Sequence, residues 1–469
     1  MHKRRLVFRY PLLMIGMIII ILFFSPFLIS WITKTALSVL NGGQVRANWL
    51  NTAEILGSYP RLQFQFSQDI EPEVVIASFY VEPEITGTWT WLEEDLAVWQ
   101  PDASIPAGQS IHFGFQNPEA SLDSNVGRLK PFEWQAFIRA PEIVFLKGVG
   151  NGKELFKISP ENPEIEIQLT QTDGKIVDFT VSPDGEQILF SKSNERAGWD
   201  LWIMNRDGQA QIMILDCGVD RCSSADWNPL RDEIVFTIEN SSNETTFTNE
   251  ELPKPYVLNL ITGTTMPLLN DPQKVGYDPT WSSRGQWITF WEGMDGGIVI
   301  LHGTSKEVGF ADSSSEDTGC WSPEERYYYY SDVKEEGLPI ISIIYQVEIL
   351  SGVRNYFTDS DLFDLGYNYY YPVCHPRGQG LLVVVQVDPK IPGRELWWVL
   401  PDGSYEVVFN DLSQIVTQFT WSPDGSKVLF LSDSLAGLSD GSKIGIWETE
   451  SFSSQQLFSD YIFQAHWLP

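Results

Sequence analysis

A seven-residue motif that recurs through the C-terminal two-thirds of the chain constrains the fold more than any other feature of the sequence. The fullest copy, FTWSPDG, occupies residues 419–425. Weaker copies occur elsewhere in the chain. The residues at the proline position of the seven copies are, in chain order, Pro183, Pro229, Ser283, Pro323, Pro376, Pro423 and Pro469. Successive marks lie 46, 54, 40, 53, 47 and 46 residues apart, a spacing typical of the blades of a β-propeller.

One repeat unit contains the parts of a small sheet. After residues 423–425 come three short runs of aromatic and β-branched residues, 427–432, 443–448 and 455–458. Together with the strand that ends in the motif, these runs predict four strands, because turn residues separate them and Asp-Gly favours a tight hairpin. Such a sheet cannot bury both faces alone. The units should therefore stack on one another, with the Trp of the motif as a wedge between them.

The two ends of the repeat region complement each other. Complete units begin at about residues 176, 222, 275, 317, 369 and 415, whereas 142–169 supply three strands without an inner one and 462–469 supply an inner strand alone. Pairing these fragments would satisfy backbone groups that both sheet edges otherwise expose. We therefore expect an all-β fold with a seven-bladed β-propeller over residues 141–469; a six-bladed ring with a loose tail is the alternative. Where the motif fails, at Ser283 and at Cys374 and His375, we expect irregular blades.

The motif and its surroundings resemble the β-propeller repeats of the TolB family, whose pattern runs Trp-Ser-Pro-Asp-Gly, Ile-x-Phe and Asp-Ile-Trp. Residues 179–205 match this pattern most fully, and the resemblance covers about residues 142–469. It implies a propeller and leaves the function open, because such propellers serve as scaffolds, as sugar or peptide binders and as entry domains of hydrolases.

Residues 58–140 show alternating strands without the propeller period. Leu62, Phe64 and Phe66 alternate with polar residues, and further strand signals occur at 74–81, 87–91, 96–99, 110–115 and 132–138. This spacing predicts a small β-sandwich. The order FSxxIxP (66–72), WxP (99–101) and PAG (106–108) resembles the bacterial Ig-like domains of surface-layer proteins. That resemblance implies a spacer or adhesive module with no chemistry of its own.

The N-terminal segment has the composition of a membrane anchor. Residues 1–10 carry Lys3, Arg4, Arg5 and Arg9, and an uncharged apolar stretch over 11–33 follows. At ~1.5 Å per residue this stretch can cross a hydrocarbon core of about 30 Å as a transmembrane helix, with the basic flank in the cytoplasm. We expect a single-pass cell-membrane protein with residues 34–57 as a juxtamembrane linker and the C-terminal bulk extracytoplasmic. A cleaved signal peptide is the alternative.

The net charge excludes one class of partner. The chain has 62 acidic and 31 basic residues, so phosphate groups would be repelled over most of its surface, and we expect no nucleic-acid partner.

No catalytic, cofactor or metal site is evident in the sequence. Residues 437–441 (GLSDG) spell a nucleophile elbow around Ser439, but in a polar loop followed only by His466, which indicates a chance match. Metal-ligand spacing is missing among the five histidines, which are His2, His112, His302, His375 and His466. Acidic residues in one loop could offer oxygens to Ca²⁺, although a solvated loop is favoured: Asp359, Asp361 and Asp364.

The four cysteines divide by context. Cys217 and Cys222 flank four residues in a loop between blades, and an oxidising compartment would allow a disulfide between them. Cys320 and Cys374 lie at or beside the Trp position of the motif, so we expect them to be small buried hydrophobic residues.

These patterns predict an extracytoplasmic binding or scaffold protein, tethered by its N-terminal helix, that holds a protein or glycan partner at the propeller face. Two alternatives remain. A propeller enzyme acting on glycans would need carboxylates that converge on the axial funnel. The TolB likeness also suggests an accessory subunit of an envelope complex.

Overall fold

The computed structural model describes residues 44–469 except for 51–52, 117–127, 241–251, 270, 272–273, 295, 304–307, 316, 335–339, 358–365 and 436–441. The chain divides into two compact units. Unit 1 comprises the residues up to Leu56 together with Pro60–Ile138, and unit 2 comprises Gly57–Tyr59 and Arg139–Pro469. Within the described residues no helix has the length and apolar character to cross a bilayer. The stretch expected to do so, 11–33, lies outside them.

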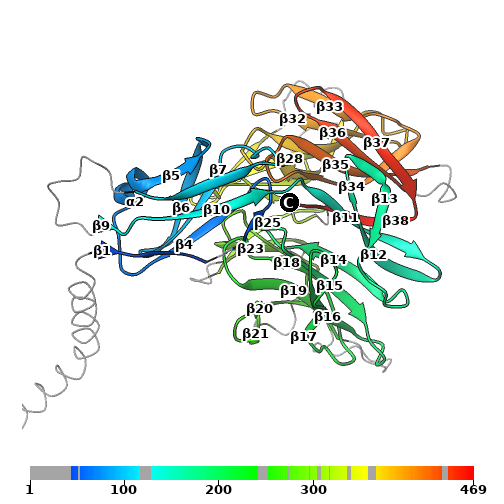
Figure 1. Cartoon of the computed structure of the whole chain (residues 1–469). Coiled ribbons are helices and arrows are strands. Elements are labelled where there is room, and N and C mark those ends of the chain that lie inside the picture. Colours follow the sequence, from blue (N-terminus) through cyan, green and yellow to red (C-terminus); the bar gives the residue numbers. More distant parts are fainter. Residues whose placement is uncertain are drawn as a thin grey trace, which may run out of the picture. The chain divides into compact units, whose positions relative to one another are not determined.

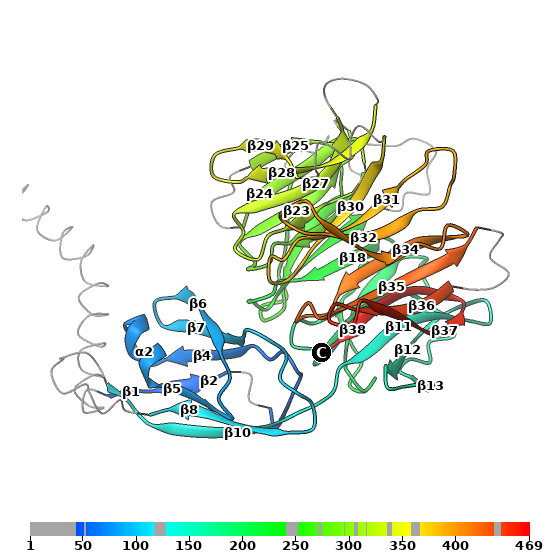
Figure 2. The ribbon, with the colours of Figure 1, turned by 90° about the horizontal axis from the view of Figure 1, so that it is seen from above.

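Unit 1 contains two four-stranded sheets that share one core (Figure 2). The first, in spatial order, holds β2 (Ala47–Trp49), β4 (Leu62–Phe66), β7 (Leu96–Pro101) and β6 (Gly87–Glu93). The second holds β3 (Ile55–Leu56), β10 (Phe132–Ile138), β8 (Ser110–Phe115) and β5 (Phe79–Glu82), and a parallel pair joins β1 (Gln44–Val45) to β9 (Arg128–Leu129). Alternation along β4 buries Leu62, Phe64 and Phe66 as expected, and the Phe64 and Phe115 rings meet between the sheets at 5.2 Å.

A strand expected over residues 74–81 is wrong for its first part. Pro72–Ser78 form a short helix, α2, and strand β5 begins only at Phe79. Pro72 lies in the first turn, where its missing N–H is no loss and its fixed φ suits a helix. Val75 and Ser78, three residues apart, are buried on one face of α2. Packing of this face overrides the strand preference of the β-branched residues.

Unit 2 contains five four-stranded sheets and one eight-stranded sheet (Figure 1). In the eight-stranded sheet a single parallel pair, Trp199 with Arg221, joins two antiparallel groups of four strands. Counting these two groups separately, we number the four-stranded groups as sheets 1 to 7 from the N-terminal side. Each is given from its inner to its outer strand. Sheet 1 has β38 (Ile462–Leu468), β11 (Glu142–Val149), β12 (Gly152–Ser159) and β13 (Asn162–Gln168); sheet 2 has β14 (Ile176–Val181), β15 (Gln187–Ser193), β16 (Trp199–Asn205) and β17 (Ile212–Leu215); sheet 3 has β18 (Arg221–Trp227), β19 (Glu233–Glu239), β20 (Lys254–Asn259) and β21 (Thr265–Pro267). Sheet 4 has β22 (Gly276–Trp281), β23 (Trp287–Glu292), β24 (Gly297–His302) and β25 (Val308–Asp312); sheet 5 has β26 (Cys320–Trp321), β27 (Tyr327–Val333), β28 (Ser342–Glu348) and β29 (Val353–Tyr356). Sheet 6 has β30 (Asn368–Cys374), β31 (Leu381–Gln386), β32 (Glu395–Val399) and β33 (Tyr405–Phe409); sheet 7 has β34 (Gln414–Trp421), β35 (Lys427–Ser434), β36 (Ser442–Glu448) and β37 (Ser453–Asp460).

Apolar cores lie between consecutive sheets of unit 2, and their order is cyclic. Sheets 2 and 3, 3 and 4, 4 and 5, 5 and 6, and 6 and 7 each share a core. Sheet 1 shares one core with sheet 2, which includes Val144 and Phe190, and another with sheet 7, which includes Ile143 and Leu429. Every sheet therefore buries both faces against neighbours, as in a propeller-type all-β fold.

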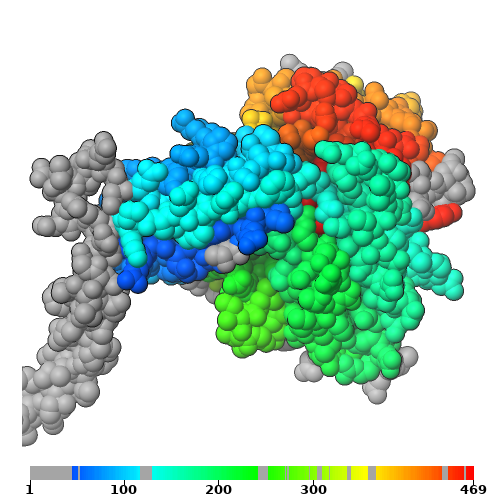
Figure 3. Space-filling model, in the orientation of Figure 1, coloured from blue at the N-terminus to red at the C-terminus, as the bar shows by residue number. Residues whose placement is uncertain are grey.

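Strand β38 joins the two ends of unit 2, as the sequence suggests. It pairs antiparallel with β11, with Leu468 opposite Glu142 and Trp467 opposite Ile143. In Figure 2 the order β38, β11, β12, β13 is visible, and in Figure 3 red C-terminal residues lie against the teal residues of sheet 1. The carbonyl of Pro469 accepts hydrogen bonds from Arg139 and Arg206, at 3.2 and 2.7 Å.

Sheets 4 and 6, where irregular blades were expected at Ser283 and at Cys374 and His375, both have four paired strands. The irregularity within them is a register shift between the inner strand and the next one, which other sheets also show. The Ser283 hydroxyl donates to the carbonyl of Ser322 at 2.8 Å. Local hydrogen bonds thus replace the missing motif residue.

Because β38 fills the inner position of sheet 1, Trp467→Ala should lower the free energy of unfolding of unit 2 by ~3–5 kcal/mol, as for other buried Trp residues. Phe463→Ala is the matched control: Phe463 lies on the same strand and is 54% exposed, whereas Trp467 is 6% exposed. The control should cost less than ~1 kcal/mol. Calorimetric melting of both variants, and of a chain lacking residues 462–469, measures the difference. Equal losses, or unchanged melting of the shortened chain, would contradict closure by β38.

Candidate functional site

The inner strands of unit 2 share a local distortion. Pairing with the next strand shifts by a bulge in β38, β14, β18, β22, β30 and β34. Ser224, Asp278 and Tyr371 lie at these shifts in the left-handed region, with φ of 51°, 48° and 53°. A bulge re-aims side chains and leaves backbone groups without a ladder partner. The inner strands must therefore satisfy these groups in another way.

Polar side chains of one inner strand bond the backbone of the inner region of the next sheet, and we call these contacts backbone clasps. Asp178 Oδ2 accepts from the N–H of Ser224 at 2.7 Å, which joins sheet 2 to sheet 3. The other backbone clasps run from Asp226 to the N–H of Trp281 (2.8 Å), from Asp317 to the N–H of Tyr371, from Gln418 to the N–H of Ala465 (2.8 Å) and from Gln464 to the N–H and C=O of Phe179 (3.3 and 2.9 Å). These hydrogen bonds satisfy buried backbone N–H groups that have no partner on the neighbouring strand at a bulge. Asp178, Gln418 and Gln464 each stand three positions before the motif's Trp position. Asp226 stands one position and Asp317 four positions before it, so the pattern is incomplete and was not recognised in the sequence.

Burial shifts the pKa of several groups on these strands. It raises the pKa of Asp178, and it raises the pKa of Asp226 from 3.8 to about 6 against the backbone hydrogen bonds from Trp281 and Trp227. It also raises the pKa of Asp317 to about 6, although the Ser331 hydroxyl bonds this carboxylate. A carboxyl group with a pKa near 6 can serve as a general acid or base. Here, however, each of the three accepts a backbone N–H from the next sheet.

The described histidines are dispersed. His375 is fully buried in sheet 6, its Nε2–H donates to the carbonyl of Gly425 at 3.1 Å, and its Nδ1 accepts from the N–H of Arg377. Burial lowers the pKa of His375 and of His466 to about 4, so both rings are neutral near pH 7. His112 lies in unit 1, and His302 packs on Trp287. Across the described ranges no group of His, Cys, Asp or Glu could hold a metal ion.

Two loops that the sequence offers as candidate sites lie outside the described residues. These are the loop with Asp359, Asp361 and Asp364 and the loop with Ser439.

The cysteines form two disulfides. Cys217 pairs with Cys222, which lies at the start of β18. The expectation that Cys320 and Cys374 are separate buried hydrophobic residues is wrong, because they form a disulfide that joins β26 of sheet 5 to β30 of sheet 6. Their Cα atoms lie 5.6 Å apart, within the range that a disulfide spans. Contacts between blades cannot be read from the context of each cysteine alone.

A groove of about 390 Å³ lies between sheets 5 and 6. Its walls include the hairpin turn at Pro323 and Glu324 and the facing turn at Gly378. Aromatic and amide side chains from sheet 5 complete it: Tyr327, Tyr329, Gln346, Tyr356 and Phe357. The groove could not be recognised in the sequence because its residues come from separate segments between residues 322 and 401. The run of four tyrosines at 327–330 was the one available signal.

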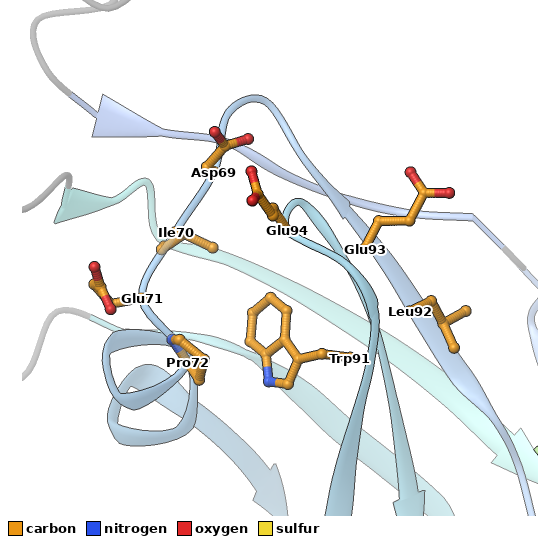
Figure 4. Close-up of a pocket in the computed structure, with 8 residues that line it drawn as sticks. All are labelled: Asp69, Ile70, Glu71, Pro72, Trp91, Leu92, Glu93 and Glu94. Carbon is orange, nitrogen blue, oxygen red and sulfur yellow. The ribbon is translucent and has the colours of Figure 1, made fainter.

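Unit 1 has a separate acidic cleft of about 680 Å³ (Figure 4). Asp69 and Glu71 line it from the loop before α2, and Glu93 and Glu94 line it from the β6–β7 turn. Figure 4 shows Asp69 and Glu94 pointing toward one another. The Trp91 ring between these walls stacks on Phe66 at 5.8 Å and so belongs to the core. The cleft favours positively charged groups.

Comparison with known proteins gives remote matches only among solved structures, since no family model and no curated protein matches the chain. TolB from Acinetobacter baumannii is 15% identical and is matched over 70% of this chain and 83% of its own, with a TM-score of 0.42. An oligogalacturonate lyase in complex with manganese is 10% identical, over 68% and 85%, with a TM-score of 0.47. A prolyl endopeptidase is 10% identical, over 83% of this chain and 50% of its own, with a TM-score of 0.49. The propeller-type fold of unit 2 is evident from the cyclic order of its own sheets and cores.

The raised pKa of Asp226 makes its ionised form unfavourable in the folded chain. Because the folded chain binds this proton more tightly, the stability contributed below pH ~4 is lost as pH rises through about 6. The pKa of Asp226 is about two units higher in the folded chain than in the unfolded chain, which corresponds to ~3 kcal/mol of stability at ~1.4 kcal/mol per unit. Asp226→Asn keeps an oxygen for the N–H of Trp281, so it should raise the melting temperature at pH 7.5 and change it little at pH 4. Asp232→Asn, at an exposed position just before β19 of the same sheet, is the control. A variant that melts lower than the native chain at pH 7.5 but equally at pH 4 would refute this assignment.

Loop length predicts which disulfide stabilises more. Cys320–Cys374 closes a separation of 54 residues and Cys217–Cys222 one of 5. In the chain-entropy model these loops are worth ~4 and ~2 kcal/mol. Replacing Cys320 and Cys374 by Ser should therefore lower the melting temperature more than replacing Cys217 and Cys222. Peptide mapping without reduction should first recover both linked pairs, and recovery of four alkylated thiols would show that the pairs do not form.

Proposed function

We propose that this chain is a membrane-tethered, extracytoplasmic binding protein whose seven sheets are the blades of a closed seven-bladed propeller. The propeller, residues 141–469, holds a protein or glycan partner at one of its faces. Residues 58–140 act as an Ig-like spacer. Residues 11–33 span the membrane, residues 1–10 lie in the cytoplasm and residues 34–57 link the anchor to the spacer.

The observation that carries this proposal is that three buried carboxylates near the inner strands form structural hydrogen bonds between sheets. Burial raises the pKa of Asp178, Asp226 and Asp317, as it would for a general acid or base, yet each carboxylate accepts an N–H from the next sheet. A catalytic carboxylate must reach the proton that it transfers. Redirecting these oxygens to a substrate would leave buried N–H groups unpaired, at ~1–3 kcal/mol each. Such an arrangement supports a rigid binding scaffold.

A glycan-cleaving enzyme is the second candidate, and one observation favours it. Asp278 is exposed on β22, and its charge is one of the causes that raise the pKa of Asp178. Two neighbouring carboxyl groups with different environments are the usual means of glycoside cleavage. In that case Asp278 would be the residue free to act on a substrate.

Both candidates can be tested on the full-length chain in intact cells. A membrane-impermeant, amine-reactive crosslinker should give a larger adduct of this chain, because the propeller faces outside the membrane and holds a partner. The same chain without residues 1–33 should stay in the cytoplasm and give none. Purified full-length chain should also release no new reducing ends from polysaccharides.

The enzyme would be supported instead if reducing ends appeared with the native chain and were lost with Asp278→Asn. Absence of any adduct from intact cells would overturn the proposed location and binding role.

A further inference from the structure

The groove between sheets 5 and 6 has rigid walls. The Cys320–Cys374 disulfide joins the two inner strands beneath it, and Cys374 lines the groove. Buried His375 fixes the next position, since both of its ring nitrogens bond backbone groups. At the rim, Gly378 has a φ of 71°, and a Cβ there would lie 3.8 Å from Pro323 of the opposite turn. A ligand would therefore meet a preformed site, which lowers the entropy lost on binding.

The groove combines ring faces with hydrogen-bonding groups. The hydroxyl of Tyr329 accepts from Gln346 Nε2 at 2.8 Å, and a hydroxyl that accepts one hydrogen bond can still donate its own hydrogen. Burial raises the pKa of Tyr329, which keeps this hydroxyl protonated. The Tyr329 ring meets Phe357 edge to face at 5.1 Å, and Tyr356, 46% exposed, packs on Tyr345 at 5.3 Å. Apolar faces beside a few fixed polar groups are typical of small-molecule sites.

The residues that line the groove carry one negative charge and no positive charge. Glu324 is its one acidic lining residue, and neutral His375 adds no positive charge. The nearby guanidinium of Arg326 lies over the Tyr327 ring at 5.0 Å and is paired with Glu348 at 2.8 Å. The whole chain has a formal net charge of −31, which also disfavours anionic ligands.

We propose that this groove binds a short neutral saccharide, with the tyrosine rings against its C–H faces and Tyr329 and Glu324 at its hydroxyl groups. A volume of about 390 Å³ lies near the lower end of the ~300–1,000 Å³ usual for ligand sites, which suits a mono- or disaccharide and not a folded protein. The inference deepens the proposed binding role and rests on it. A proline-rich peptide also prefers aromatic grooves, and the test therefore includes one.

The test uses purified full-length chain and calorimetric titration with lactose, maltose, N,N′-diacetylchitobiose, digalacturonate and an octaproline peptide. At least one neutral disaccharide should bind saturably, and digalacturonate should bind at least about tenfold more weakly. Tyr356→Ala should weaken the neutral sugar about tenfold, or ~1.4 kcal/mol. Tyr405→Ala is the matched control, because Tyr405 is 41% exposed on sheet 6 and also packs on one ring, Trp397. It should leave the affinity unchanged.

Three results would overturn the proposal. The first is no saturable binding of any neutral disaccharide up to about 50 mM, a range chosen because weak sites have a Kd near ~1 mM. The others are an equal loss of sugar affinity in both variants, or binding of octaproline alone that Tyr356→Ala removes. Each is separable from failure of the proposed function. The crosslinked adduct in intact cells would persist if only the saccharide site were absent, and it would be missing if the chain bound no partner.

Discussion

The antiparallel pairing of β38 with β11 is the contact on which the rest of unit 2 depends. It brings Leu468 opposite Glu142, more than 300 positions earlier, and gives sheet 1 its inner strand. The same strand supplies Trp467 to the core shared with sheet 7 and Leu468 to the core shared with sheet 2. Because each sheet contacts only its neighbours, one missing inner strand would open two interfaces at once. Arg139 and Arg206 hold the last carbonyl in place.

Closure brings the bulged inner strands together, and titratable groups on these strands become buried. Two of these groups, the Asp226 carboxyl and the His466 ring, change the stability of the folded chain in opposite directions with pH. The raised pKa of Asp226 means that stability is lost as pH rises from about 4 to about 6. The lowered pKa of His466 means that stability is lost as pH falls from 6.5 to about 4, since the unfolded chain takes up the proton first. Carboxylates and histidines in one interior therefore flatten the pH dependence of the propeller.

Local signals in the sequence predicted the repeat, the hairpins and the fragment that completes sheet 1, because turns and strand edges are determined by near neighbours in the chain. Helix α2 was missed because Val74, Val75 and Ile76 favour strands and only packing reveals the helical face. The Cys320–Cys374 disulfide was missed because it depends on which positions of neighbouring sheets stack. The groove combines residues of two sheets, so no single stretch of sequence predicts it. Features between repeats depend on how neighbouring sheets pack, and the periodicity of one repeat does not predict that packing.

The groove lies where the repeat is least regular. Strand β26 is only two residues long, whereas the other inner strands have six to eight, so sheet 5 has the weakest inner edge of the described sheets. The Cys320–Cys374 disulfide and the bond from Asp317 to the N–H of Tyr371 hold that edge to sheet 6. A covalent link replaces ladder hydrogen bonds there, which leaves room between the sheets without loosening the ring. Departures from local regularity that are compensated elsewhere are where functional sites are expected, and this junction is such a departure.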